Sequence, residues 1–144
     1  MYIINGNSED ETGRAIGIWY AQQVNKPLYG PFGALGFLDK DGNMGGAAIF
    51  LNYNSSNIEL HVYGPGCMTR QVLKAIMNYV FSDLKCNRLT AIERRSNKQM
   101  LRILPRLGFI YEAVLVSYFG PDKKDDGIVF RITPEQASKY KWIV

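Results

Sequence analysis

The chain has 144 residues, 47% of them hydrophobic, and a formal net charge of +4 at pH 7. This length predicts a single domain, residues 1–144, that can bury a hydrophobic core. The longest apolar runs span only a few residues, which argues against a transmembrane helix, and residues 1–20 lack the features of a signal peptide. We therefore expect a cytoplasmic protein with no membrane partner.

The cysteine and histidine content argues against a disulfide or a structural metal site. Cys67 and Cys86 are the only cysteines, and His61 is the only histidine. Without a signal peptide, two cysteines are expected to remain free thiols. With no CxxC motif and one histidine, no zinc site is predicted.

The N-terminal half reads as a strand, a helix and a three-stranded meander. Residues 1–5 suit a short strand, and Ser8 and Glu11 form a capping box that predicts a helix to about Val24. The Asp41-Gly42 turn and a second turn at 54–57 separate the strands of the meander. The expected meander strands are 32–38, 45–52 and 58–63.

The centre of the chain predicts a strand, a turn, a helix and a parallel strand. Apolar residues recur at helical spacing between Thr69 and Leu84, and residues 88–94 alternate as a strand. Together with the strand 58–63, these segments form a βαβ unit.

The C-terminal third reads as a helix, a two-stranded pair and a last short helix. Ser96 and Gln99 suggest a capping box for a helix that contains Pro105 and stops at Gly108. A long strand is expected over 109–119, a final strand over 128–132, and a short helix capped by Thr133.

The turn 63–70 is the most informative local feature. It contains glycines and joins a strand to the N-terminus of an amphipathic helix. The first N–H groups of a helix have no helical partner and lie at the positive end of its dipole. Such a turn is typical of a phosphate or pyrophosphate site.

A second electrostatic feature is the window 94–106, which holds five cationic side chains and no acid: Arg94, Arg95, Lys98, Arg102 and Arg106. It is either a solvated helix face or a surface for phosphate groups on a cofactor or on nucleic acid.

The order of elements resembles the GCN5-related N-acetyltransferase (GNAT) family over nearly the whole chain, and short bacterial and phage members look most similar. The resemblance is strongest over 95–109, where an N-capped helix ends in Leu107-Gly108-Phe109 before a strand carrying Tyr111-Glu112. It implies an α/β (α+β) fold with a mixed, mostly antiparallel twisted sheet of six to seven strands and helices on both faces.

The resemblance also implies an acetyl-CoA-dependent N-acetyltransferase that transfers an acetyl group directly to an amine on a protein or small molecule. The turn would hold the pyrophosphate of acetyl-CoA, and the splayed strands 58–63 and 88–94 would hold its pantetheine arm. The residues that correspond to cofactor contacts are Val62, Tyr63, Gly64, Gly66, Cys67, Met68, Thr69, Arg70, Lys74 and Asn97.

The sequence departs from the family pattern in two respects. With the glycines of the pyrophosphate motif placed at Gly64 and Gly66, His61 stands where the family has Gln or Arg. If the motif is aligned instead on the apolar face of the helix, Met68 or Thr69 stands where a tiny residue belongs. Leu104 stands where many members carry a tyrosine that protonates the leaving thiolate.

Catalytic candidates lie on the strand before the turn. Glu59 and His61 are two residues apart and so face the same side of that strand. Histidine titrates near neutral pH and can accept the proton of the amine directly, whereas Glu59 would act through water. Glu93 is a weaker candidate, and Tyr111 or Tyr118 could replace the missing tyrosine; packing roles are the alternative for each. Cys67 lies at a helix N-terminus, which lowers a thiol pKa, although a buried inert thiol is the simpler interpretation.

A competing hypothesis is a catalytically inactive GNAT-fold binding module. It would contact nucleic acid or a protein partner through the basic window 94–106. In the enzyme hypothesis, the amine acceptor would lie between residues 26–33 and the hairpin 119–128, and homodimerisation is left open.

Overall fold

The computed structural model describes residues 2–64 and 67–143. Seven strands form one sheet in the order β1-β2-β3-β4-β5-β7-β6. The strands are β1 Tyr2–Asn7, β2 Gly33–Leu38, β3 Met44–Leu51, β4 Asn57–Tyr63, β5 Arg88–Arg94, β6 Ile110–Leu115 and β7 Gly127–Ile132. The helices are α1 Glu11–Val24, α2 Arg70–Met77, α3 Lys98–Arg106 and α4 Pro134–Lys139, with a π-helical turn η1 Asn78–Asp83 and a 3-10 turn η2 Lys123–Asp125.

The sheet is antiparallel except between its two central strands. β4 and β5 are parallel, and every other neighbouring pair is antiparallel. The helix α2 connects β4 to β5, which confirms the predicted βαβ unit. The seven-stranded mixed sheet thus matches the predicted fold class.

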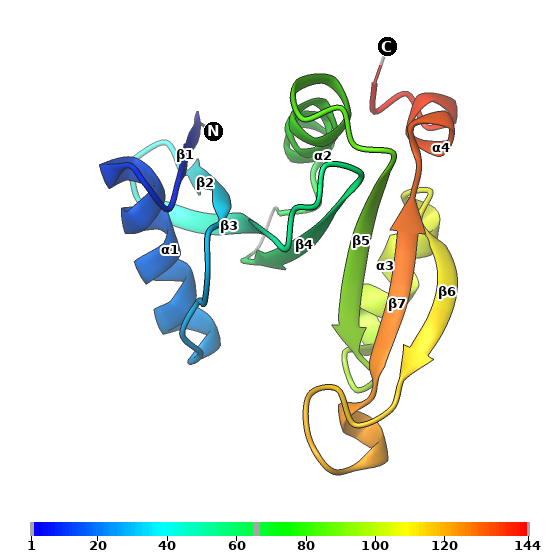
Figure 1. The fold of residues 1–144 in the computed structure, drawn as a ribbon. Coiled ribbons are helices and arrows are strands. Elements are labelled where there is room, and N and C mark those ends of the chain that lie inside the picture. Colours follow the sequence, from blue (N-terminus) through cyan, green and yellow to red (C-terminus); the bar gives the residue numbers. More distant parts are fainter. Residues whose placement is uncertain (1, 65–66, 144) are drawn as a thin grey trace.

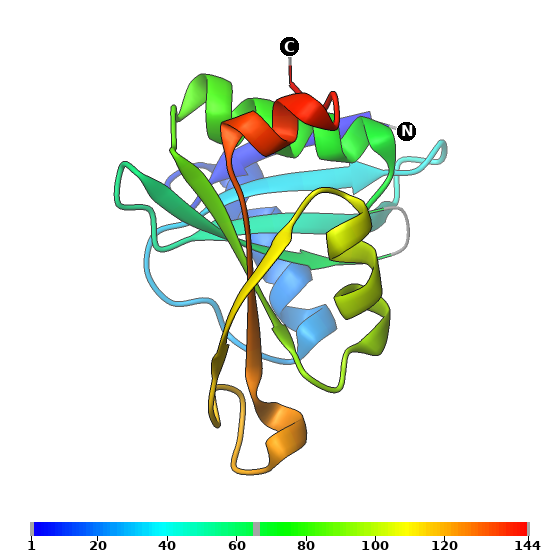
Figure 2. The same cartoon turned by 90° about the vertical axis from the view of Figure 1, so that its right-hand side faces the viewer.

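Helices cover both faces of the sheet, as predicted. On one face, Ile16 and Tyr20 of α1 pack against Ala34, Ala47 and Ile49 of β2 and β3. On the other face, α2 supplies Val72, Leu73, Ile76 and Met77 to the larger core cluster, to which α3 and α4 also contribute. Figures 1 and 2 show α4 lying next to α2, on the face opposite α1.

Two predicted helix caps are displaced by one or two residues. The cap of α1 is Asp10, whose side chain accepts from Gly13 N–H at 2.6 Å, while Ser8 Oγ accepts from Phe32 N–H. The cap of α3 is Asn97, not Ser96, and its side chain accepts from Met100 N–H at 3.4 Å. The predicted capping boxes at Ser8 and Ser96 are therefore wrong.

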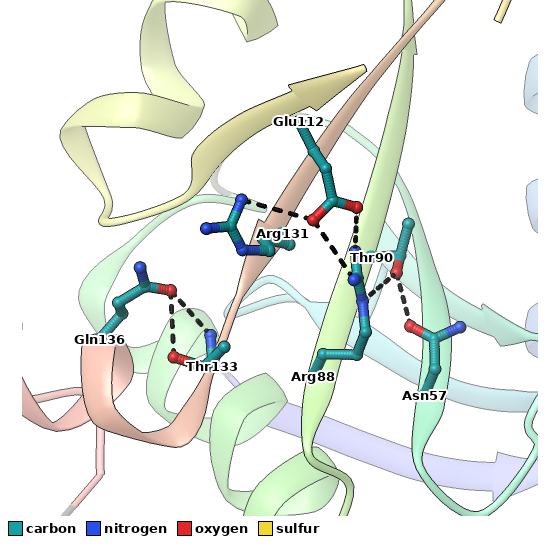
Figure 3. Close-up of polar contacts among 7 residues, drawn as sticks. All are labelled: Asn57, Arg88, Thr90, Glu112, Arg131, Thr133 and Gln136. Atoms are coloured by element: carbon teal, nitrogen blue, oxygen red, sulfur yellow. Dashed lines mark hydrogen bonds and ion pairs between the residues drawn. The ribbon is translucent and has the colours of Figure 1, made fainter. Parts of the chain in front are cut away.

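The remaining caps follow the sequence. Thr69 caps α2 by accepting from Val72 N–H at 3.4 Å. Thr133 and Gln136 form the predicted box at the start of α4, and their contact is visible in Figure 3.

The strand expected over 109–119 ends early, at Leu115. Ser117 adopts a positive φ of 57°, and its N–H donates to the side chain of the buried Asp126 at 2.9 Å. A backbone N–H held by this carboxylate does not continue the strand ladder, so residues 116–126 form a long connection between β6 and β7.

Within residues 2–64 and 67–143, the helices are too short or too polar to cross a lipid bilayer.

Candidate active site

The parallel strands β4 and β5 separate halfway along their length. They pair from Asn57 with Arg88 to Leu60 with Ala91. Beyond that point β4 continues to Tyr63 paired only with β3, and β5 continues to Arg94 paired only with β7. Two strand edges therefore face each other unpaired, and Figure 1 shows the strands diverging. Such edges present N–H and C=O groups to an extended ligand.

Side-chain contacts hold the closed end of this splay together (Figure 3). The Thr90 hydroxyl on β5 donates to the side-chain oxygen of Asn57 on β4. Arg88 donates to Thr90 at 3.2 Å and to both Glu112 carboxylate oxygens, and Arg131 contacts the same carboxylate at 3.3 Å. These bonds join β4, β5, β7 and β6 at the end of the sheet where β4 and β5 are still paired.

A pocket of about 570 Å³ lies at the open end of the splay. Its walls come from α1 and residues 26–29, from the splayed ends of β4 and β5, and from the β6–β7 connection. The two segments expected to flank the acceptor, 26–33 and 119–128, thus both contribute to one pocket. His61, Val62, Glu93 and Asn97 also line it.

Glu93 is the most strongly perturbed carboxylate of this pocket. Burial raises its pKa from 4.5 to about 7, partly offset by the nearby His61 and by a hydrogen bond that Asn97 Nδ2 donates at 3.4 Å. Burial, together with the Glu93 charge, also raises the pKa of Tyr20 to about 12. A carboxylate that titrates near neutral pH beside a pocket is suited to general-base chemistry.

Glu59 and His61 lie together, as the strand alternation predicts. His61 Nε2 is 3.5 Å from Glu59 Oε2, and Asn52 Nδ2 donates to the same oxygen at 2.9 Å. The His61 contact and the Asn52 hydrogen bond hold the pKa of Glu59 below its usual range. His61 Nε2 is buried and makes no hydrogen bond of good geometry. A buried nitrogen in this state retains unused hydrogen-bonding capacity.

The turn after β4 depends on Gly64, which has a φ of +108°. A Cβ at this position would lie 2.4 Å from the Gly45 carbonyl oxygen, so only glycine fits against β3. Thr69 then caps α2, whose first N–H groups lack helical acceptors. The predicted contact residue Gly66 lies outside the described residues.

The other residues predicted to contact the cofactor lie around the turn and differ in their exposure and packing. Arg70 is exposed and its guanidinium lies 5.3 Å from the Trp142 ring centroid, and Lys74 is exposed one turn later. Tyr63 packs edge-on against Trp19 at a centroid distance of 5.9 Å. Val62, Cys67 and Met68 pack partly buried against the core.

The pKa of the Cys67 thiol is raised and not lowered, which agrees with the buried, inert thiol that the sequence favours. Burial raises the pKa of the thiol, and the charge of Glu93 adds to the increase. Desolvation of the thiolate outweighs the helix N-terminus here, so Cys67 is a packing residue with a poorly ionised thiol.

The tyrosine candidates lie in different places. Tyr111 is on β6 at the sheet edge, where its ring packs edge-on against Phe130, and it is not among the residues that line the splay pocket. Tyr118 lines the splay pocket, and burial raises its pKa. Leu104, at the family's tyrosine position, is fully buried in the core. The structure therefore brings Tyr118, and not Tyr111, to His61 and Glu93.

The basic window 94–106 is partly neutralised. Arg94 contacts Asp125 at 2.6 Å and Arg95 contacts Asp126 at 3.3 Å, and both aspartates are buried. Lys98, Arg102 and Arg106 remain on the exposed surface of α3. The window is thus split between structural ion pairs and a short exposed stripe.

Sequence reasoning underestimated Glu93. It continues the alternation of Leu89 and Ala91, both of which face the core, so an acid in this register on a buried strand was a usable signal. Within residues 2–64 and 67–143, no group of His, Cys, Asp and Glu side chains forms a metal-binding cluster.

Sequence comparison finds no relative: no protein-family model matches the chain, and no curated protein matches it. Comparison of structures does find similar proteins. A mutant of the spermidine N-acetyltransferase SpeG from Vibrio cholerae superposes with a TM-score of 0.72 at 17% identity, covering 98% of each chain.

Two further structures agree. A dodecameric spermidine N-acetyltransferase from V. cholerae has a TM-score of 0.63 at 16% identity, over 92% of this chain and 79% of that one. A GNAT-family acetyltransferase from Bacillus anthracis has a TM-score of 0.58 at 16% identity, over 71% and 66%. The chain therefore has the GNAT fold that the sequence predicts.

Proposed function

We propose that this chain is an acetyl-CoA-dependent N-acetyltransferase that transfers an acetyl group directly to an amine. The observation that carries this proposal is the splay of β4 and β5, which leaves two unpaired strand edges beside a pocket containing a carboxylate with a pKa of about 7. The fold shared with N-acetyltransferases supports it.

The residues around the splay fit an extended ligand with amide groups and a pyrophosphate. The free edges at Val62–Tyr63 offer backbone partners for the amides of a pantetheine arm. The tight Gly64 turn leads into the N-terminus of α2, where N–H groups and the exposed Arg70 and Lys74 suit phosphate oxygens. Asn97 is available near the arm, although its side-chain oxygen already caps α3.

Acetyl-CoA would supply the acetyl group as a thioester. The acceptor amine reaches the pocket mainly as an ammonium ion and must lose a proton before it can attack. We assign that proton to Glu93, whose pKa of about 7 makes its ionised fraction rise as pH increases through neutrality, and which lines the pocket. His61, braced by Glu59, is the second acceptor at the same end of the pocket.

The departing thiolate needs little assistance, because a CoA thiolate is a tolerable leaving group. Tyr118 is the tyrosine placed to protonate it, since Tyr118 lines the pocket and burial raises its pKa, which keeps the phenol protonated. Leu104 is fully buried, and its aliphatic side chain has no proton to donate to the thiolate.

The test combines binding and turnover. Acetyl-CoA at 100 times its Kd should stabilise the protein by about 2.7 kcal/mol, read as a rise in Tm. The protein is then assayed with acetyl-CoA and a panel of amines. Acetyl transfer to an amine should release free CoA, which a thiol reagent detects. A protein whose Tm is unmoved by acetyl-CoA and that releases no CoA would overturn the proposal.

The binding-module alternative receives less support from the structure. Two of the five cations in the basic window are engaged by buried aspartates. Binding to DNA or RNA with a steep salt dependence, together with no response to acetyl-CoA, would favour that alternative.

A further inference from the structure

Two cationic side chains meet at one aromatic ring in the wall of the splay pocket. Lys26 Nζ lies 5.4 Å from the Phe119 ring centroid, and Arg94 Cζ lies 5.0 Å from the same centroid. All three residues line the pocket. Placing two like charges beside one ring is unfavourable unless counter-charges are near.

Arg94 is held in place by an ion pair with a buried carboxylate. One of its terminal nitrogens donates to Asp125 Oδ1 at 2.6 Å, and the other Asp125 oxygen accepts from Asp122 N–H at 3.2 Å. Asp125 is buried, whereas the Arg94 side chain is 36% exposed. The remaining guanidinium donors can therefore face a ligand from a fixed orientation, which favours a planar anion.

Lys26 has no carboxylate within ion-pair distance among residues 2–64 and 67–143. It follows the left-handed Asn25 that ends α1, at the rim of the pocket. Lys26 thus places a cationic charge without an ion-pair partner beside the Phe119 ring, next to the Arg94–Asp125 pair.

The opposite charge in the same pocket comes from Glu93. Glu93 and Arg94 are consecutive residues of β5, so their side chains leave the strand on opposite faces. The rest of the lining is mainly aromatic and aliphatic, with Tyr20, Leu28, Leu51 and Ile92. A ligand with a basic group for Glu93, an acidic group for Lys26 and an apolar body is complementary to this lining.

Resting on the proposed function, we propose that the acceptor is a small amine that also bears a carboxylate, of the class of amino acids with apolar side chains. Its amine lies toward Glu93 and His61, and its carboxylate lies between Lys26 and Arg94. The pocket of about 570 Å³ has the size of a small-molecule site.

This class differs from that of the structural neighbours from V. cholerae, which are named as spermidine N-acetyltransferases. Spermidine carries further ammonium groups and no anion. In this chain those groups would meet Lys26 and Arg94, so the charge pattern disfavours a polyamine.

The test compares amines that differ only in a carboxylate. Pairs of an amino acid and its decarboxylated amine, such as phenylalanine with phenethylamine and leucine with isoamylamine, are assayed for CoA release alongside spermidine. We expect kcat/KM to be more than about tenfold higher for the acid of each pair, the effect of one charge-assisted contact.

A second experiment changes the charge of residue 26, at the rim of the splay pocket. Lys26→Glu should remove the preference for the acid by raising its KM, and Lys26→Met should weaken it, while the KM for acetyl-CoA stays constant. Lys40→Glu makes the same charge change on the exposed β2–β3 turn, away from the pockets, and should leave the preference intact.

Direct binding separates the two proposals. If the acids raise Tm in a Lys26-dependent way but no amine releases CoA, the enzyme proposal fails and the ligand class stands. If CoA is released equally with the decarboxylated amines or faster with spermidine, or if Lys26→Glu changes acetyl-CoA binding alone, the ligand class is wrong.

Discussion

At the scale of single residues, the proposed chemistry centres on Glu93, whose environment is built from distant parts of the chain. His61 of β4 and Asn97 at the start of α3 lower its pKa, and its own charge raises the pKa of Tyr20 of α1. Strand alternation indicates that Glu93 faces the core, but it does not reveal these distant neighbours. The sequence does identify the Glu59 and His61 pair, since two residues on one strand face are fixed by alternation alone.

The raised pKa of Glu93 makes both activity and stability depend on pH. Because its carboxylate must be ionised to accept a proton, kcat/KM should rise with pH through about 7 and then level off. Glu93→Gln should lower kcat by roughly 10²- to 10⁴-fold and abolish this rise. A pH–rate profile of both proteins tests this, and a variant that keeps the rise would place the base elsewhere, with His61→Ala the next protein to assay.

The same group makes the folded state bind more protons than the unfolded state between pH 4.5 and about 7. The free energy of unfolding should therefore fall as pH increases through that window, by at most about 3 kcal/mol. Glu93→Gln should flatten this dependence in urea titrations. An unchanged slope would mean that Glu93 titrates normally in the folded protein.

At the scale of elements, sequence patterns located the helices and strands well and their ends less well. Asp10 and Asn97 lie two and one residues after the predicted caps. Ser8 bonds instead to the Phe32 backbone, and the Asn97 side chain also donates to Glu93. Ser117 ended β6 early through a bond to Asp126, nine residues away in sequence. End positions thus depended on partners that adjacent residues do not reveal.

The turn between β4 and α2 is the element most sensitive to a single methyl group. Gly64→Ala places a Cβ 2.4 Å from the Gly45 oxygen at a φ of +108° and should destabilise the protein by about 1–3 kcal/mol, with weaker acetyl-CoA binding. Gly42→Ala is the matched control, because φ is +83° there but no atom lies within 4 Å of the added Cβ. Equal losses in chemical denaturation would show that backbone strain alone, and not the contact with β3, constrains the turn.

At the scale of the whole molecule, the sheet consists of two parts joined by a short seam. Four residue pairs connect β4 to β5, and the Asn57–Thr90 contact lies within that seam. The part before the seam carries α1, and the part after it carries α3 and the long β6–β7 connection. The overall order of elements made this fold predictable from the sequence. The length of the seam was not predictable, because it depends on how far two separately supported strands stay together.

A ligand that pairs with both free edges should protect both of them. We expect acetyl-CoA to slow amide hydrogen exchange over residues 61–63 and 92–94, while exchange at the seam, 57–60 and 88–91, changes little. Mass-spectrometric exchange with and without acetyl-CoA measures this. Protection confined to the exposed α3 surface would place the ligand outside the splay.

The separation of β4 and β5 also limits which molecules can bind between the two strands. Exposed strand edges usually invite other polypeptides to add a strand, and this leads to aggregation. Here the free edges lie in the interior of the sheet, with β3 behind one and β7 behind the other. A full strand needs about 4.8 Å of separation on each side and room for side chains on both faces. A ligand arm with amide groups can use the same edge hydrogen bonds but carries no alternating side chains, so it needs less room above and below the sheet than a strand does.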